Sequence, residues 1–206
     1  MCSIMLVEVI RVKIIKRNYL QEVIDVMGTP DIKVITGVRR SGKSELLNMF
    51  KEYVIETDKK SNIIFIDFNL DKFDDLKQYK QLIKYIDERY DERKNNYIII
   101  DEVQMCDGFE KAINNFHAEE KYDIYITGPN AFLLSSDLAT LFTGRTYSIE
   151  VFPFSYKEFL EYYEYDNTYD NFNKYVLEGG FSGSYLYKEL EKKYNYIKDV
   201  YKTLIV

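Results

Sequence analysis

One stretch of the sequence decides the fold, Val34-Ile35-Thr36-Gly37-Val38-Arg39-Arg40-Ser41-Gly42-Lys43-Ser44. Apolar residues run directly into the pattern G-x-x-x-x-G-K-S, which is typical of a phosphate-binding loop between a strand and a helix. Its glycines let backbone N–H groups curl around phosphate oxygens, Lys43 supplies charge to the outer phosphates, and Ser44 can ligate magnesium. A helix opening at Lys43 adds its positive dipole end. The stretch therefore predicts a site for a nucleoside triphosphate.

The whole loop and the first helical residues after it are candidate nucleotide contacts. They are Gly37, Val38, Arg39, Arg40, Ser41, Gly42, Lys43, Ser44 and Glu45. Because the backbone N–H groups already bind phosphate, neither arginine is required for that purpose. We expect one arginine to face the ligand and the other to tie the loop to neighbouring carboxylates.

Apolar runs alternate with helical patterns along the rest of the chain. Five short apolar runs bounded by turn residues predict strands over 32–36, 63–68, 97–100, 124–127 and 146–151. Helices are expected over 16–27, over 45–55, and in a long polar segment with the buried stripe Leu76, Tyr79, Leu82, Ile83 and Ile86. The alternation predicts an α/β fold with a doubly wound, mainly parallel five-stranded sheet, whose ligands bind beyond the carboxyl ends of the strands.

The sequence divides into three expected regions. An N-terminal extension and helix occupies 1–30, a P-loop core 31–152, and a small helical segment 153–206. Within the last region, helical patterns cover 156–165, 172–177 and the residues from 186 onward. The final residues, 204–206, are apolar and carry no cap or stop signal, so we expect the chain to end inside an element.

Composition excludes several classes of protein. The net charge of −6 argues against a surface dedicated to nucleic-acid phosphates. Cys2, Cys106 and the single histidine, His117, are too few for a disulfide framework or a zinc site, which favours a reducing, cytoplasmic compartment. We interpret Cys106 and His117 as packing or surface residues. No apolar run approaches the length of a membrane span, so no membrane partner is expected.

A pair of carboxylates follows the third predicted strand. Asp101 and Glu102 come directly after four apolar residues, 97–100. Asp101 is expected to hold magnesium through water, beside Ser44, and Glu102 to polarise the water that attacks the terminal phosphate. With a further strand, 63–68, between the loop and this pair in sequence, the order is typical of the additional-strand class of P-loop ATPases.

Three polar positions are candidates to complete the site. The amide of Asn130, after the fourth strand, would orient the water or contact the terminal phosphate, with Thr127 as the alternative and a plain turn as the structural interpretation. Arg145, before the fifth strand, is either an arginine finger for a neighbouring subunit or a surface arginine. Asn69 is interpreted as a turn residue rather than as a partner of Glu102.

Several segments together resemble one known family. They are Lys33–Ser44, Asp101–Gln104, Ile126–Gly128, Leu138–Arg145 and Pro153–Ser155. The set resembles the AAA-type ATP-binding proteins of archaea and bacteria that pair such a core with a C-terminal domain of unknown function. The resemblance implies ATP binding and hydrolysis with magnesium, in a longer protein whose second domain is missing here. Pro129 departs from the family, which has serine at that position.

Two functions are expected ahead of others. The first is Mg²⁺-dependent ATP hydrolysis that drives a conformational change, with Lys43, Ser44, Asp101 and Glu102 as the working residues. The second is a switch or scaffold that binds ATP without turnover. A small-molecule kinase is disfavoured because the segment after 156 is poor in arginine, and a GTPase because no Asn-Lys-x-Asp segment is present. Expected partners are ATP or ADP, further copies of this chain, and a protein or nucleic acid bound by the missing domain.

Overall fold

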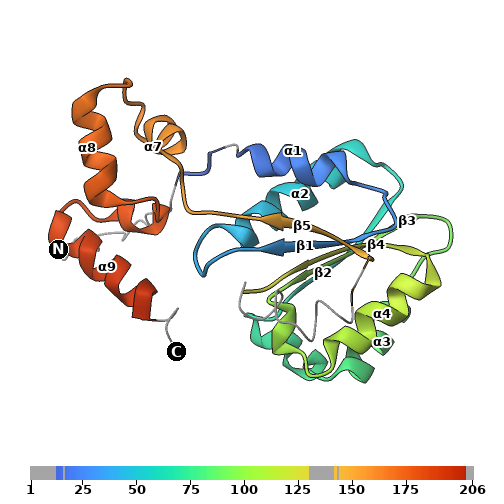
Figure 1. Cartoon of the computed structure of the whole chain (residues 1–206). Coiled ribbons are helices and arrows are strands. Elements are labelled where there is room, and N and C mark those ends of the chain that lie inside the picture. The colour runs from blue at the N-terminus through green and yellow to red at the C-terminus, as the bar shows by residue number, and fades with distance from the viewer. Residues whose placement is uncertain (1–12, 16, 130–141, 143, 203–206) are drawn as a thin grey trace, which may run out of the picture. The chain divides into compact units, whose positions relative to one another are not determined.

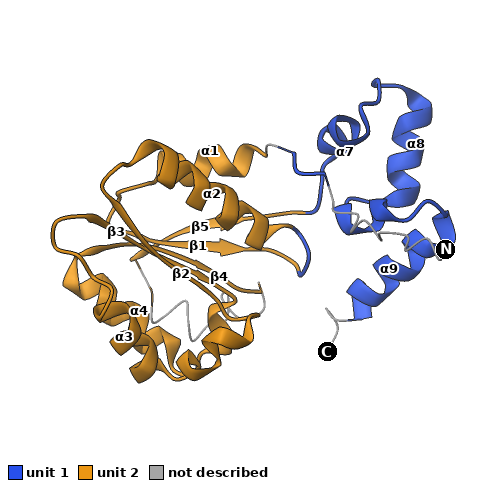
Figure 2. Cartoon of the chain, turned by 180° about the vertical axis from the view of Figure 1, so that it is seen from behind, with its two compact units in different colours: residues 1–16, 39–41, 153–206 blue, residues 17–38, 42–152 orange. Residues whose placement is uncertain are grey.

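The computed structural model of the chain describes residues 13–15, 17–129, 142 and 144–202 (Figure 1). It groups them into two compact units, shown in Figure 2. Unit 2 comprises 17–38 and 42–152, and unit 1 comprises 1–16, 39–41 and 153–206. No helix in the described part of the chain has the length and apolar character needed to cross a membrane.

Unit 2 is built on a five-stranded parallel sheet. Its strands are β1 (Ile32–Thr36), β2 (Ser61–Asp67), β3 (Asn95–Asp101), β4 (Tyr122–Thr127) and β5 (Thr146–Glu150). They are arranged in the order β2-β3-β4-β1-β5, and every neighbouring pair is parallel. The predicted parallel α/β sheet is therefore confirmed.

Helices cover both faces of this sheet. Figure 1 shows α1 (Asn18–Asp25) and α2 (Lys43–Thr57) on one face, with α3 (Tyr79–Asp87) and α4 (Phe109–Glu119) on the other. Because successive strand residues point to opposite faces, Ile99 packs with the cluster under α1 and α2, while Ile98 and Ile100 pack with the cluster under α3 and α4. Burial on both faces explains the unbroken apolar run of β3.

The strand order identifies the additional strand of the sheet. The strand that separates β1 from β3 in space is β4, whereas β2, which separates them in sequence, lies at the edge. The predicted class is right, but the additional strand is β4 and not the predicted strand over 63–68, which corresponds to β2. The order of the strands along the chain does not determine their order in the sheet.

The segment predicted as one long polar helix is divided. A 3₁₀ helix, η1 (Asp71–Leu76), precedes α3, and of the two residues between them Gln78 has an extended backbone. The backbone there pairs with Asp107: Asp107 N donates to Lys77 O at 2.9 Å, and Tyr79 N donates to Asp107 O at 3.1 Å. This pairing requires an extended residue and interrupts the helix. Helix α4 was not predicted.

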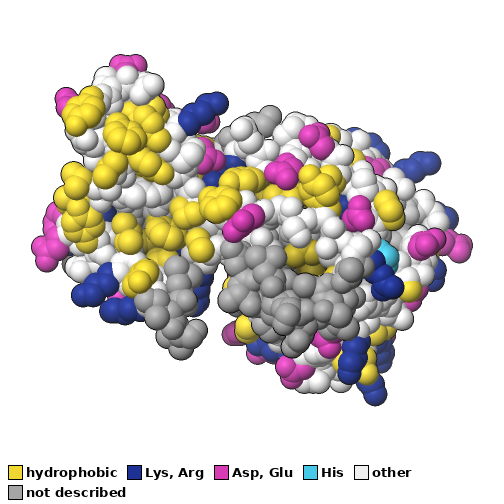
Figure 3. Space-filling model, in the orientation of Figure 1, with side chains coloured by type: hydrophobic (Ala, Val, Ile, Leu, Met, Phe, Trp, Pro, Cys, Tyr) yellow, Lys and Arg dark blue, Asp and Glu magenta, His cyan; other side chains and the backbone are white. Residues whose placement is uncertain are grey.

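Unit 1 is helical and rich in aromatic side chains. It contains α7 (Tyr156–Tyr163), α8 (Tyr169–Glu178), the 3₁₀ helix η3 (Ser182–Leu186) and α9 (Leu190–Lys202). A capping box between Ser155 and Glu158 starts α7. Phe159 is fully buried among aromatic rings, including Tyr175 and Tyr185. Figure 3 shows further hydrophobic side chains on the surface of this unit, where α8 has no buried residue.

Candidate functional site

The phosphate loop joins the carboxyl end of β1 to the first turn of α2. Gly42, at the N-cap of α2, has a φ of 101°, a left-handed conformation that side-chain-bearing residues rarely adopt. The helix then runs for 15 residues from Lys43. The loop thus presents the N-terminus of a long helix at the carboxyl edge of the sheet, which is the geometry that binds phosphate groups.

Lys43 lies across this loop. Its side chain is 4% exposed, and Nζ donates to the carbonyl oxygens of Gly37 at 3.0 Å and Val38 at 3.3 Å. The ammonium group is therefore held inside the curve of the loop.

The other candidate nucleotide contacts differ in exposure. Gly37 and Ser41 are buried, Val38 and Gly42 are half-buried, and Arg39, Arg40, Ser44 and Glu45 are exposed.

The carboxylate pair lies at the same edge, at the end of β3. Asp101 is the last residue of β3 and is 1% exposed, and Thr127 is the last residue of β4 and is fully buried. The Thr127 hydroxyl donates a hydrogen bond to Oδ1 of Asp101 and accepts one from the backbone N–H of Glu102 at 3.0 Å. The two neighbouring strands therefore fix the position of Asp101 and of the Glu102 backbone.

The electrostatic environment of Asp101 suits a divalent cation. Burial raises the pKa of Asp101 above its usual range, while hydrogen bonds from Ser44 and Thr127 oppose that rise. The nearby carboxylates of Glu102 and Asp67 raise the pKa further. A buried carboxylate in acidic surroundings is relieved by a bound cation. Ser44 is close enough to influence the pKa of Asp101, and the two side chains carry oxygen donors of the kind that Mg²⁺ prefers.

Glu102 has an unusual backbone conformation and a polar neighbour. Its φ is 55° and its ψ is 50°, in the left-handed region. Its carboxylate Oε2 accepts a hydrogen bond from the side-chain amide of Gln104. No role was predicted for Gln104, although it ends the segment Asp101–Gln104 that contributes to the family resemblance; in the structure it lies in the short turn Val103–Met105.

Asn69 does not bond to Glu102 in the described structure. It donates to Asp67 Oδ1 at 2.9 Å from both its backbone and its amide nitrogen, as a turn residue does.

Two further residues, Asn130 and Arg145, were predicted to be catalytic. Asn130 lies outside the described residues, so its role stays a prediction. Arg145 lies at the opposite, amino edge of the sheet, where its carbonyl accepts a hydrogen bond from Ile32 N at 2.8 Å. From Ile32 to the loop, the rise of about 3.3 Å per residue in β1 amounts to roughly 13 Å or more. Arg145 is exposed, and Nη1 lies 3.4 Å from Asn114 Oδ1.

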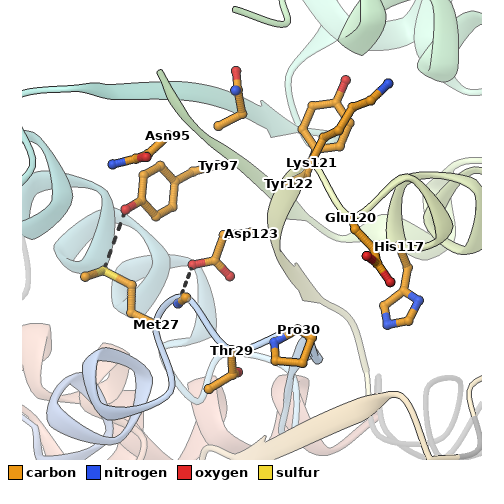
Figure 4. A pocket seen from close by; sticks show the side chains of 12 residues that line it. Met27, Thr29, Pro30, Asn95, Tyr97, His117, Glu120, Lys121, Tyr122 and Asp123 are labelled. Carbon is orange, nitrogen blue, oxygen red and sulfur yellow. Dashed lines mark hydrogen bonds between the residues drawn. The ribbon is translucent and has the colours of Figure 1, made fainter. Parts of the chain in front are cut away.

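The amino edge also has a cavity of about 620 Å³ (Figure 4). Its lining residues are Met27–Pro30, Asn95–Tyr97, His117 and Glu120–Asp123. Their polar groups are largely engaged within the fold: Asp123 accepts hydrogen bonds from Lys33 Nζ at 2.7 Å, Gly28 N at 2.8 Å and Tyr125 Oη at 2.9 Å. These bonds stabilise the amino ends of the strands. We therefore place the candidate site at the carboxyl edge.

Sequence comparison relates the chain to known proteins. Residues 29–160, more than half of the chain, match the family described as "AAA domain". An uncharacterized protein of Haemophilus influenzae is 38% identical over 175 residues, which cover 81% of this chain and 43% of that protein. An uncharacterized protein of Methanocaldococcus jannaschii is 30% identical over 136 residues, or 64% of this chain and 28% of that protein. The chain thus spans less than half the length of either relative.

Comparison with solved structures supports the fold. Domain III of the replication initiation protein DnaA from Thermotoga maritima aligns with a TM-score of 0.53 and 17% identity, over 88% of this chain and 90% of that domain. AMPPCP-bound DnaA from Aquifex aeolicus aligns with a TM-score of 0.50 and 16% identity, over 87% and 59% of the two chains. At such low identity these similarities show a shared fold alone.

Proposed function

Because this chain belongs to the AAA domain family, we propose that it binds ATP together with Mg²⁺ and hydrolyses the terminal phosphate. The observation that carries the proposal is that Ser44, at the start of α2, lies close enough to the buried carboxylate of Asp101, at the end of β3, to lower its pKa. This proximity joins the phosphate loop to the carboxylate pair at one edge of the sheet. This combination supports hydrolysis as well as binding.

Each residue has a part in the proposed site. Backbone N–H groups of 37–42 and the start of α2 bind phosphate oxygens, and the Lys43 ammonium leaves the loop carbonyls to meet the outer phosphates. Ser44 and Asp101 would hold Mg²⁺, which supplies positive charge to the phosphate groups. The raised pKa of Asp101 supports this assignment, because a carboxylate in that environment gains from a neighbouring cation.

Glu102 is the proposed acceptor of the water proton. The water oxygen forms a bond to the terminal phosphorus, the bond from phosphorus to the bridging oxygen breaks, and ADP leaves with that electron pair. The water proton passes to the Glu102 carboxylate and from there to solvent. Thr127 holds the Glu102 backbone during this step, and Asn130 is retained as a candidate to orient the water.

Arg145 is proposed to act on a second copy of the chain. At the amino edge it is remote from its own phosphate loop, and it is exposed. Such an arginine serves catalysis only when another subunit presents its nucleotide to it, as an arginine finger does. The proposal therefore includes a homo-oligomer in which one copy completes the site of the next.

The process that ATP hydrolysis drives is also part of the proposal. We expect hydrolysis to drive a conformational change that acts on a protein or nucleic-acid partner in the cytoplasm, through parts of the longer protein that this chain does not include. The short coverage of both curated relatives supports the existence of such parts.

Calorimetry and phosphate release test the proposed function together. With Mg²⁺ present, the parent chain should bind ATP and release phosphate, and Lys43→Ala should do neither. Lys80→Ala, which changes an exposed lysine of α3, is the matched control and should behave as the parent does. ATP binding without phosphate release would instead support the nucleotide-dependent switch. Failure of the parent to bind ATP would contradict both functions.

A further inference from the structure

Gln104 is bonded to the carboxylate proposed to activate water. It is the middle residue of the 3₁₀ turn Val103–Met105, and its Nε2 donates to Oε2 of Glu102. An ionised carboxylate only accepts hydrogen bonds, so the nitrogen of the amide, and not its oxygen, must face Glu102. The orientation of the Gln104 amide is therefore chemically determined.

Both ends of Glu102 are restrained. The backbone is in the left-handed region, which few residues other than glycine, asparagine and aspartate adopt, and its N–H donates to the Thr127 hydroxyl at 3.0 Å. The side chain is restrained by Gln104. A strained backbone conformation persists only where the surrounding contacts enforce it, and such residues concentrate at functional sites. The bonds to Thr127 and Gln104 together fix the position of the Glu102 carboxylate.

The other end of the Gln104 amide is not satisfied within the described part of the chain. Its Oε1 is buried and has no hydrogen-bond partner there. A buried carbonyl oxygen without a donor destabilises a fold. Stabilisation of the fold therefore explains the bond between Gln104 and Glu102 poorly. A role for the Gln104 amide in the reaction explains it better.

We propose that Gln104 is a positioning residue for Glu102. Its Nε2 fixes Oε2 of the carboxylate, so that Oε1 stays available to accept the proton of the attacking water. This inference rests on the proposed hydrolysis.

Steady-state kinetics on the full chain test this role. Gln104→Ala and the isosteric Gln104→Glu, which removes the donor, should each lower kcat by about tenfold or more and leave KM and the ATP Kd within about twofold. Gln81→Ala, an exposed glutamine of α3, should match the parent. In a Glu102→Gln background, Gln104→Ala should cause no further loss. Full activity of Gln104→Glu, or an additive loss in the double variant, would overturn the proposal.

A spectroscopic measurement separates this inference from the proposed function. The side-chain amide protons of Gln104, assigned by their disappearance in Gln104→Ala, should shift upfield in Glu102→Ala because the bond to the carboxylate is lost. An unchanged resonance would overturn the role of Gln104 even if the chain hydrolyses ATP. If the resonance shifts in Glu102→Ala but the parent chain releases no phosphate, the proposed hydrolysis is refuted. The contact between Gln104 and Glu102 is then retained, and with it the positioning of Glu102.

Discussion

The hydroxyl of Thr127 donates a hydrogen bond to Oδ1 of Asp101, between the final residues of the neighbouring strands β4 and β3. The same hydroxyl accepts the backbone N–H of Glu102 at 3.0 Å. One buried side chain therefore links the Asp101 carboxylate and the Glu102 backbone to the additional strand of the sheet. Strand β4 thus supplies the two hydrogen bonds that hold Asp101 and the Glu102 backbone in place.

Replacing Thr127 tests that connection. Thr127→Val keeps the shape of the side chain but removes the donor to Asp101 and the acceptor for Glu102. Because buried polar groups lose their partners, we expect the free energy of unfolding to fall by about 1–3 kcal/mol and phosphate release to slow. Urea unfolding and a phosphate assay measure the two effects. Thr127→Ser retains the hydroxyl and should preserve most of the activity; equal losses in both variants would show that packing, not hydrogen bonding, matters.

The raised pKa of Asp101 predicts a pH-dependent stability. Below the ordinary value of 3.8 the side chain is protonated in both states and costs nothing. As the pH rises, the unfolded chain ionises first, so the folded state loses stability until the pH passes the raised pKa. Asp101→Asn removes this loss. Its stability relative to the parent should therefore increase as the pH rises above about 4. A difference that does not change with pH in urea unfolding would contradict the assignment.

The position of Arg145 predicts complementation between two inactive variants. Arg145→Ala retains an intact phosphate loop, while Lys43→Ala retains Arg145. If Arg145 acts on a neighbouring copy, each variant alone should lose roughly 10³-fold or more in rate. A mixture of the two should recover measurable phosphate release, and the recovery should grow with protein concentration. Arg145→Ala with parental activity, or a mixture no faster than its components, would assign Arg145 to the surface.

Cys106 provides a test of the core that does not involve nucleotide. It is 1% exposed, and burial raises the pKa of its thiol to about 12. Because only the thiolate reacts readily, a thiol reagent at about pH 8 should label Cys106 slowly in the folded chain and rapidly in urea. The measurement uses a Cys2→Ser background so that one thiol remains. Rapid labelling without denaturant would show that this part of the core opens.

The phosphate loop and the five strands could be predicted because their patterns are local. The errors arose from contacts between distant residues. The strands β2 and β3 begin earlier than predicted because polar residues there pair with each other: Asn62 Nδ2 donates to Asn96 Oδ1 at 2.7 Å. Similarly, the break before α3 depends on Asp107, about thirty residues along the chain. Hydrophobic periodicity contains no information on such pairs.

The candidate site was predictable in part for the same reason. Lys43, Ser44, Asp101 and Glu102 belong to two short patterns, and strand direction places both at one edge. The contacts that refine the site are side-chain hydrogen bonds, from Thr127 and from Gln104, which no spacing rule specifies. Arg145 could have been placed at the amino edge from the direction of β5 alone. The role of Asn130 stays a prediction.

The most direct test of the account is phosphate release from MgATP in a single turnover, compared between the parent chain and Glu102→Gln. The account predicts that Glu102→Gln binds ATP with a Kd within about twofold of the parent and releases phosphate roughly 10²- to 10⁴-fold more slowly. Release by Glu102→Gln at the parental rate would contradict the assignment of Glu102 as the group that activates water.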